Sequence, residues 1–129
     1  MSPSPEAAEW INKAEGDFHT ACRELQVRES PNYDAVCFHA QQCVEKYLKA
    51  RLAGAGRGFP RIHDLEALLN RVLPIEPEWE SFRQELQRLT DMAVEVRYPG
   101  ADADLDDAHE AVRAAERLRS AARHAMKLS

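Results

Sequence analysis

One segment decides the fold: Phe38-His39-Ala40-Gln41-Gln42-Cys43-Val44-Glu45-Lys46-Tyr47-Leu48-Lys49-Ala50. Its apolar residues recur at steps of three and four, which predicts a helix with a buried face. Amide, carboxylate and ammonium groups lie between these apolar positions. An ordinary core helix does not need so many polar groups so close together. The segment therefore predicts both a central helix and a candidate functional surface.

Similar spacing extends outward from this segment and predicts five helices and no strand. The expected helices run from about Pro5 to Arg28, from about Tyr33 to Ala53, from near His63 to Leu73, from about Pro77 to Val96, and from about Asp104 to Lys127. Ser4 is placed to cap the first helix and Asp64 to cap the short third one. Four long helices and one short helix with short connections predict an all-α antiparallel up-and-down bundle, forming one domain over residues 1–129.

The same spacing identifies the residues that we expect to be mainly buried. They are Trp10, Phe18, Val36, Tyr47, Leu69, Phe82, Leu86, Leu89, Val112 and Leu118. In the last helix we also expect Leu105 to face inward. The second helix carries further apolar residues away from its main stripe, at Phe38 and Leu52. An apolar perimeter wider than one bundle face needs predicts a homodimer.

Composition excludes several classes of protein. The chain has 129 residues, 44% of them hydrophobic and 30% charged, with a net charge of -5, so a protein built mainly to coat nucleic acid is not expected. No apolar run reaches the length of a membrane span and the N-terminus does not read as a signal peptide, so we expect a cytoplasmic protein without membrane contact. The three cysteines form no C-x-x-C pair and fit packing roles, and we expect no metal and no cofactor.

Two short motifs accompany the central segment: His63-Asp64-Leu65 before the third helix and Arg97-Tyr98-Pro99 after the fourth. Taken alone, Asp64 is a helix cap beside a surface histidine, and Arg97 is a cation suited to a helix C-terminus. Arg97 can also hold phosphate through its planar guanidinium. On the central segment, spacing alone favours an exposed ion pair between Glu45 and Lys49. The arginines of the last helix favour a solvated face over a basic strip for nucleic acid.

The three motifs together resemble the HEPN family (higher eukaryotes and prokaryotes nucleotide-binding domain). The second helix carries the resemblance most strongly, and Lys13-Ala14-Glu15-Gly16-Asp17-Phe18 is similar to the family's first helix. The resemblance implies a small helical protein that binds a nucleotide or accompanies a minimal nucleotidyltransferase. It also implies that the polar groups of the second helix form a functional site. The residues it selects for nucleotide or phosphate are Arg97, Lys46, Tyr98, Gln42, Glu45 and His63.

The chain departs from the ribonuclease branches of the family. In those relatives an arginine at this junction is followed four to six residues later by a histidine, and the pair acts on the RNA backbone. Here residues 101–103 contain no histidine, and the next one is His109. We therefore name no catalytic residue. The resemblance also suggests Tyr98 as an acceptor of a transferred nucleotide, because some related pairs modify a tyrosine near this region.

Three functions follow from these observations. The first is a binding module: a HEPN homodimer that binds nucleotide or partners a minimal nucleotidyltransferase in a toxin–antitoxin-like pair. The second is a metal-independent endoribonuclease toxin with RNA as its substrate, which the missing histidine disfavours. The third is a structural helical adaptor. For the first we expect Arg97 in a cleft near the dimer axis, with Lys46 and Tyr98 close by.

Overall fold

A computed structural model describes residues 3–128 of the chain and contains helices but no strand within that range. The elements are α1 (Pro5–Leu25), α2 (Tyr33–Gly54), α3 (Leu65–Val72), the 3-10 helix η1 (Pro77–Phe82), α4 (Arg83–Glu95) and α5 (Leu105–Ala125). The predicted all-α bundle is confirmed. The observed helices end one to three residues from the predicted bounds, apart from the fourth, whose first six residues form η1.

Side-chain caps fix where the helices begin. Ser4 Oγ accepts a hydrogen bond from the Ala7 amide at 3.2 Å, and Asp64 Oδ1 accepts one from the Glu66 amide at 2.9 Å. Asp104 and Asp107 form a reciprocal capping box at the start of α5. The caps predicted at Ser4 and Asp64 are therefore confirmed, and each satisfies backbone amides that a helix leaves unpaired.

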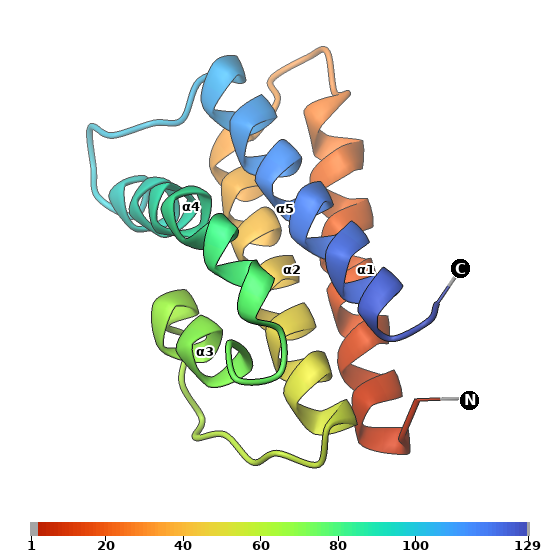
Figure 1. The fold of residues 1–129 in the computed structure, drawn as a ribbon. Helices are drawn as coiled ribbons and strands as arrows, with labels where there is room; N and C mark the ends of the chain where they lie inside the picture. Colours follow the sequence, from red (N-terminus) through yellow and green to blue (C-terminus); the bar gives the residue numbers. More distant parts are fainter. Residues whose placement is uncertain (1–2, 129) are drawn as a thin grey trace.

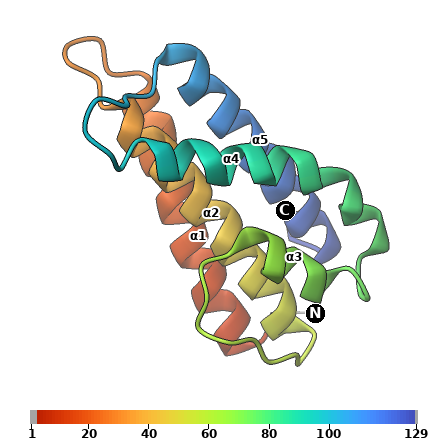
Figure 2. The same cartoon turned by 90° about the vertical axis from the view of Figure 1, so that its left-hand side faces the viewer.

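Three long helices form the body of the molecule, and α3 and α4 cover one side of it. Helix α2 lies between α1 and α4, and it runs parallel to α5 and antiparallel to α1 (Figure 1). Helix α4 passes obliquely across α2 and α5 and returns the chain to the end where α5 begins, with α3 beside it (Figure 2). Helix α2 contacts each of the other four α-helices, so it is the central element of the fold.

The core confirms most of the predicted burial. Val36, Tyr47, Leu69, Leu86, Leu89 and Leu118 are buried. Four large side chains, Trp10, Phe18, Phe82 and Val112, are only half-buried and pack at the edge of the core. The prediction for Leu105 is wrong, because it is the first residue of α5 and is 45% exposed. Leu52 is fully buried, whereas Phe38 is 41% exposed.

A partly buried cluster of polar side chains ties α1, α2 and α5 together. Glu15 accepts hydrogen bonds from Arg119 Nε at 2.6 Å and Arg119 Nη2 at 2.7 Å, and a further one from the Tyr47 hydroxyl. Arg123 Nη1 donates to the same hydroxyl at 3.1 Å. Two of the arginines that the sequence placed on a solvated face therefore hold the helices together. No helix within residues 3–128 is both long and apolar enough to span a membrane.

Candidate functional site

The polar residues of α2 share one face of the helix. Positions 38, 42, 45, 46 and 49 follow each other at helical steps, so their side chains lie on one side. Helix α1 contacts this face as well, through Asp17 at Lys46 and Trp10 at Lys49. The face is lined by Phe38, Gln42, Glu45, Lys46 and Lys49, and it is what the sequence singled out.

Glu45 is the most deeply buried charged group on this face. Its residue is 2% exposed, and Oε2 accepts hydrogen bonds from Lys49 Nζ and His63 Nδ1, both at 3.0 Å. Oε1 is buried and has no hydrogen-bond partner. Lys49 is 4% exposed, with its ammonium 5.1 Å from the centre of the Trp10 ring. Spacing alone favoured an exposed Glu45–Lys49 pair, and that interpretation is wrong because α1 and the loop after α2 cover the pair.

His63 lies over this buried pair and connects it to solvent. Its side chain is 80% exposed, although Nδ1 is held by Glu45. The amide of Gln41 donates to the His63 carbonyl oxygen at 3.4 Å, and Gln42 donates to Gln41 Oε1 at 3.0 Å. The structure thus brings Gln42, Glu45 and His63 together, three of the six predicted site residues.

Lys46 has a different set of partners. Its ammonium lies 2.5 Å from Asp17 Oδ2, and Asp17 Oδ1 lies 2.8 Å from His39 Nδ1. This triad belongs to the contact between α1 and α2. The sequence did not predict Asp17 as a partner of Lys46, because the two are 29 residues apart in the chain and no local pattern links them.

Arg97 and Tyr98 lie just beyond the end of α4. Both are exposed, and Tyr98 is 67% exposed. Helix α4 lies on one flank of α2 and α1 on the other (Figure 1). No hydrogen bond or ion pair within residues 3–128 joins Arg97 or Tyr98 to Lys46, whose partner is Asp17, so the cleft expected to hold all three stays a prediction.

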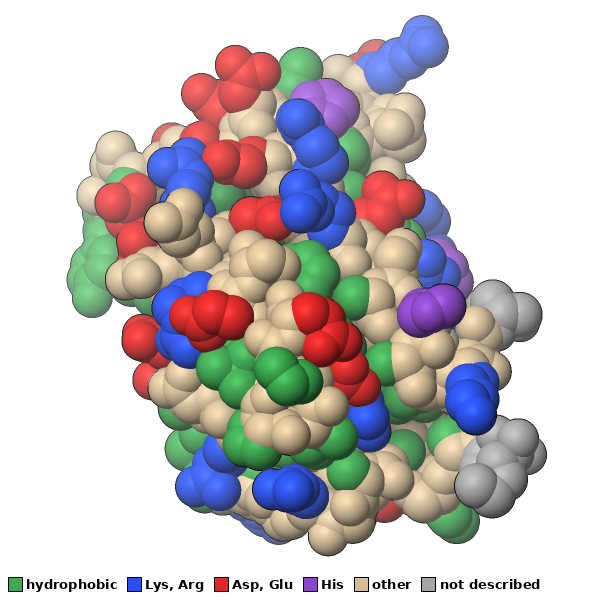
Figure 3. Space-filling view, in the orientation of Figure 1, with side chains coloured by type: hydrophobic (Ala, Val, Ile, Leu, Met, Phe, Trp, Pro, Cys, Tyr) green, Lys and Arg blue, Asp and Glu red, His purple; other side chains and the backbone are tan. Residues whose placement is uncertain are grey.

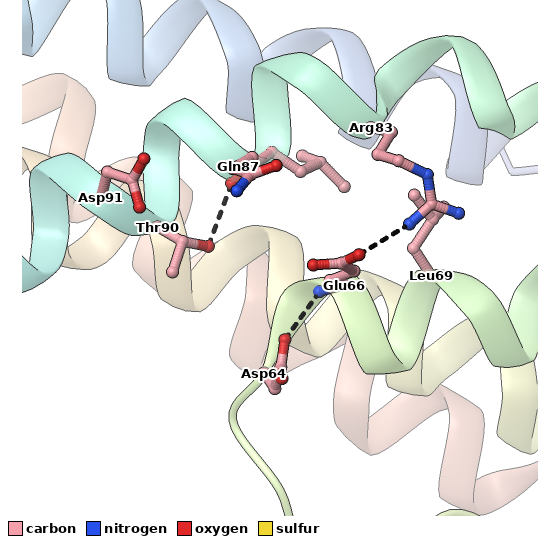
Figure 4. A pocket seen from close by; sticks show the side chains of 8 residues that line it. Asp64, Glu66, Leu69, Arg83, Gln87, Thr90 and Asp91 are labelled. Carbon is pink, nitrogen blue, oxygen red and sulfur yellow. Dashed lines mark hydrogen bonds and ion pairs between the residues drawn. The ribbon is translucent and has the colours of Figure 1, made fainter.

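A small pocket lies between α3 and α4, close to His63 in sequence. Its lining includes Asp64, Glu66, Arg83, Thr90 and Asp91 (Figure 4). Arg83 is held by Glu66 at 3.4 Å and by Glu80 at 2.7 Å, so it is not free to bind an anion. The pocket's volume of ≈ 80 Å³ is well below the several hundred Å³ of ordinary small-molecule sites. With three carboxylates and one engaged cation, this pocket does not suit phosphate.

The surface over α4 and α5 carries mixed charge and no basic strip. Acidic and basic side chains alternate on this face (Figure 3). Arg88 pairs with Glu110 at 2.8 Å and Arg117 with Glu85 at 3.2 Å. A surface neutralised in this way does not attract a polyanion.

The cysteines are buried or partly buried, and none is paired with another among residues 3–128. Burial raises the pKa of the Cys37 thiol to about 11 and the pKa of Cys43 further still. Thiols of this kind are poor nucleophiles and metal ligands near neutral pH. In the same range no group of three or more His, Cys, Asp or Glu is arranged to hold a metal ion.

Comparison with known proteins supplies the family. The chain's fold is similar to the crystal structure of an archaeal HEPN homologue, with a TM-score of 0.69 and 24% identity over 98% of this chain and 99% of the archaeal one. That likeness concerns the fold alone. No curated protein matches the chain in sequence. The family model of the HEPN domain matches residues 7–125, nearly the whole chain, and confirms the resemblance carried by the second helix. The chain therefore belongs to the HEPN domain family.

Proposed function

We propose that this HEPN domain is a nucleotide-binding partner protein of a minimal nucleotidyltransferase, in a toxin–antitoxin-like pair, and that Arg97 contacts the phosphate. The observation that carries the proposal is that the Arg97 side chain has no partner among residues 3–128. Its guanidinium makes no hydrogen bond or ion pair with the described residues, although Glu95 is two positions away. Six other arginines are paired with carboxylates within residues 3–128.

The surroundings of Arg97 favour a small ligand over RNA. Residues 91–107 contain six acidic residues and one basic residue, Arg97 itself. A long polyanion laid on this segment meets net repulsion, whereas a nucleotide phosphate needs only one guanidinium and a few donors. Tyr98 adds an exposed ring on which a base can stack. Together with the missing histidine after Arg97, this favours binding over RNA cleavage.

A protein partner has a surface to use at the same end of the molecule. Within residues 3–128, every large hydrophobic side chain that is strongly exposed belongs to one of the segments that meet there: the α1–α2 loop, the first turns of α2 and α5, and the end of α4 (Figure 1). These side chains are Val27, Phe38, Val94, Tyr98 and Leu105. Apolar side chains among acidic ones suit a protein surface that is apolar with a basic rim.

Calorimetric titration with ATP tests the site. Arg97→Ala should weaken binding at least about tenfold, the cost of one charge-assisted contact to phosphate. Arg97→Lys should restore only part of the affinity, since an ammonium keeps the charge but loses the planar fork. Arg28→Ala is the matched control, because Arg28 is an exposed arginine at the same end without an ion pair within residues 3–128. Equal affinity of the Arg97→Ala and wild-type proteins would contradict the phosphate site.

Co-expression with a minimal nucleotidyltransferase encoded beside this chain's gene tests the partnership. We expect the two proteins to co-purify, and Tyr98→Phe to lose any nucleotide that the partner transfers to the chain. An RNA cleavage assay without added metal separates this proposal from the ribonuclease alternative. Metal-independent cleavage that Arg97→Ala abolishes would identify a ribonuclease instead.

A further inference from the structure

His63 differs from the other histidines in how it is held. Its ring nitrogen Nδ1 lies 3.0 Å from Glu45 Oε2, its carbonyl oxygen accepts from Gln41, and the next residue, Asp64, caps α3. Both the backbone and the ring are therefore fixed. Yet 80% of the side chain is exposed, so this is an immobilised ring on the surface.

The contact with Glu45 determines which ring nitrogen is available. An ionised carboxylate only accepts hydrogen bonds, so Nδ1 of the neutral ring carries the proton and donates it. Nε2 then holds the lone pair, and no hydrogen bond from the described residues occupies it. A buried carboxylate behind a histidine fixes the tautomer and stabilises positive charge that develops on the ring.

Glu45 has unused capacity for this role. Its Oε2 already accepts from Lys49, but Oε1 is buried and unpartnered. Among residues 3–128, Lys49 is thus the one full cation paired with this carboxylate, since His63 is charged only when protonated. A positive imidazolium at His63 meets an incompletely satisfied carboxylate at hydrogen-bond distance.

His39 is the natural comparison, because it also contacts a carboxylate. Its Nδ1 lies 2.8 Å from Asp17 Oδ1, but the other oxygen of Asp17 is taken by Lys46 at 2.5 Å. The His39 side chain is 29% exposed and its ring packs edge-on against Phe38. His39 therefore lacks both the open side and the unsatisfied carboxylate oxygen.

The loop that carries His63 is suited to phosphate. Residues 54–63 contain Arg57, Arg61 and His63 and no acidic residue. Neither arginine has an ion pair within residues 3–128, and both are exposed. The acidic residue that follows, Asp64, is engaged by the amides of α3. Flexible guanidiniums two and six positions from the ring can neutralise a phosphoryl group there.

We propose that His63 is a phosphoryl-acceptor site, independent of the nucleotide site at Arg97. The Nε2 lone pair attacks the phosphorus of a donor with a good leaving group, such as a phosphoramidate or an acyl phosphate. The new N–P bond forms as the bond from phosphorus to the leaving group breaks, and the leaving group departs with that electron pair. The Nδ1 proton stays between the ring and Glu45, which balances the positive charge on the ring.

Phosphoramidate is the probe, with the products mapped by mass spectrometry and ³¹P NMR under alkaline conditions that preserve phosphohistidine. We expect phosphorylation at Nε2 of His63, at least about tenfold faster than at His109, which is also exposed and has no carboxylate contact within residues 3–128. His63→Gln should remove that signal. Equal rates at His63 and His109, or faster reaction at His39, would overturn the proposal.

A paired variant tests the part that Glu45 plays. Glu45→Gln/Lys49→Met removes both charges together, so that no buried ammonium is left alone, and Met keeps the contact with Trp10. The His63 rate should fall at least about tenfold while the His109 rate stays unchanged. An unchanged His63 rate in a folded variant would overturn the role of the carboxylate. Where the variant fails to fold, the His63-to-His109 ratio in the wild-type protein still decides the proposal.

Discussion

At the scale of single residues, hydrogen bonds between side chains decide which groups stay ionised and which stay protonated. Glu15 is the clearest case, since it receives two guanidinium hydrogen bonds and one hydroxyl hydrogen bond in the partly buried contact of α1, α2 and α5. The bonds from Arg119, helped by Tyr47, lower the pKa of Glu15 to about 2. Burial and the same Glu15 contact raise the pKa of Tyr47, so that hydroxyl stays a donor at any working pH.

Glu15 gives a prediction for stability against pH. Its pKa falls from 4.5 to about 2 on folding, so the ionised group stabilises the fold above pH 4.5 and loses that effect as the pH falls towards 2. Glu15→Gln should lower the free energy of unfolding by about 1–3 kcal/mol at neutral pH, and by less at about pH 3. Urea unfolding at both pH values measures this. Glu9→Gln, an exposed glutamate of α1 without an ion pair within residues 3–128, is the control, and an equal loss there would contradict the role of Glu15.

Residue identities alone could not reveal these pairings. The spacing of Glu45 and Lys49 predicts that the two side chains meet. It does not predict the rings that cover Lys49, because Trp10 lies 39 residues earlier and Phe59 lies in the loop after α2. His63 reaches Glu45 over 18 positions, and Arg119 reaches Glu15 over 104. Helical periodicity shows on which face of a helix a residue lies, but whether that face is buried depends on tertiary packing.

At the scale of elements, local chemistry set the helix bounds well. Caps at Ser4, Asp64 and Asp104 and the proline at position 5 identify helix starts whatever the rest of the chain does. The fourth helix was the exception. Trp79 and Phe82 are three residues apart, a spacing that fits the 3-10 helix and the α-helix equally, so η1 was read as the start of α4.

Helix α3 depends on its cap more than the long helices do. It has eight residues, too few for much intrinsic helix stability, and Asp64 Oδ1 accepts from the amides of Glu66 and Ala67. Asp64→Ala should lower the free energy of unfolding by about 1 kcal/mol, measured in urea, and should raise amide hydrogen exchange in α3 before α1. Asp64→Asn keeps a capping oxygen and should restore most of the loss. An unchanged unfolding midpoint for Asp64→Ala would show that packing alone holds α3.

At the scale of the whole molecule, charge and exposed apolar surface are unevenly divided. The end formed by the α1–α2 loop and residues 91–107 is acidic and carries the exposed hydrophobic side chains. The loop 54–63 carries arginines without acids. The two proposed sites, at Arg97 and at His63, therefore lie in opposite electrostatic settings. This division was not predicted from the net charge of -5, which averages over both.

The structure reduces the apolar surface on which the homodimer was predicted from two residues, Phe38 and Leu52, to one. Leu52 is fully buried within one protomer, so Phe38, at 41% exposure, is the remaining apolar residue on the open face of α2. A two-fold arrangement that pairs this face with its copy covers Phe38 and Gln42 of both chains. Since a single aromatic side chain per protomer supplies the apolar contact, we expect a modest dimer, with a dissociation constant of about micromolar order.

Sedimentation equilibrium at about tens of micromolar chain tests this dimer. The wild-type protein should be dimeric. Phe38→Ser should shift it to monomer, because serine removes the aromatic surface that the dimer would bury. Val27→Ser is the matched control, since Val27 is similarly exposed at 38% but belongs to the loop beyond α1. A wild-type monomer would contradict the dimer, and a dimer that survives Phe38→Ser would place the interface away from α2. If Phe38→Ser dissociates the dimer and also weakens nucleotide binding, Arg97 acts in a cleft that both copies build.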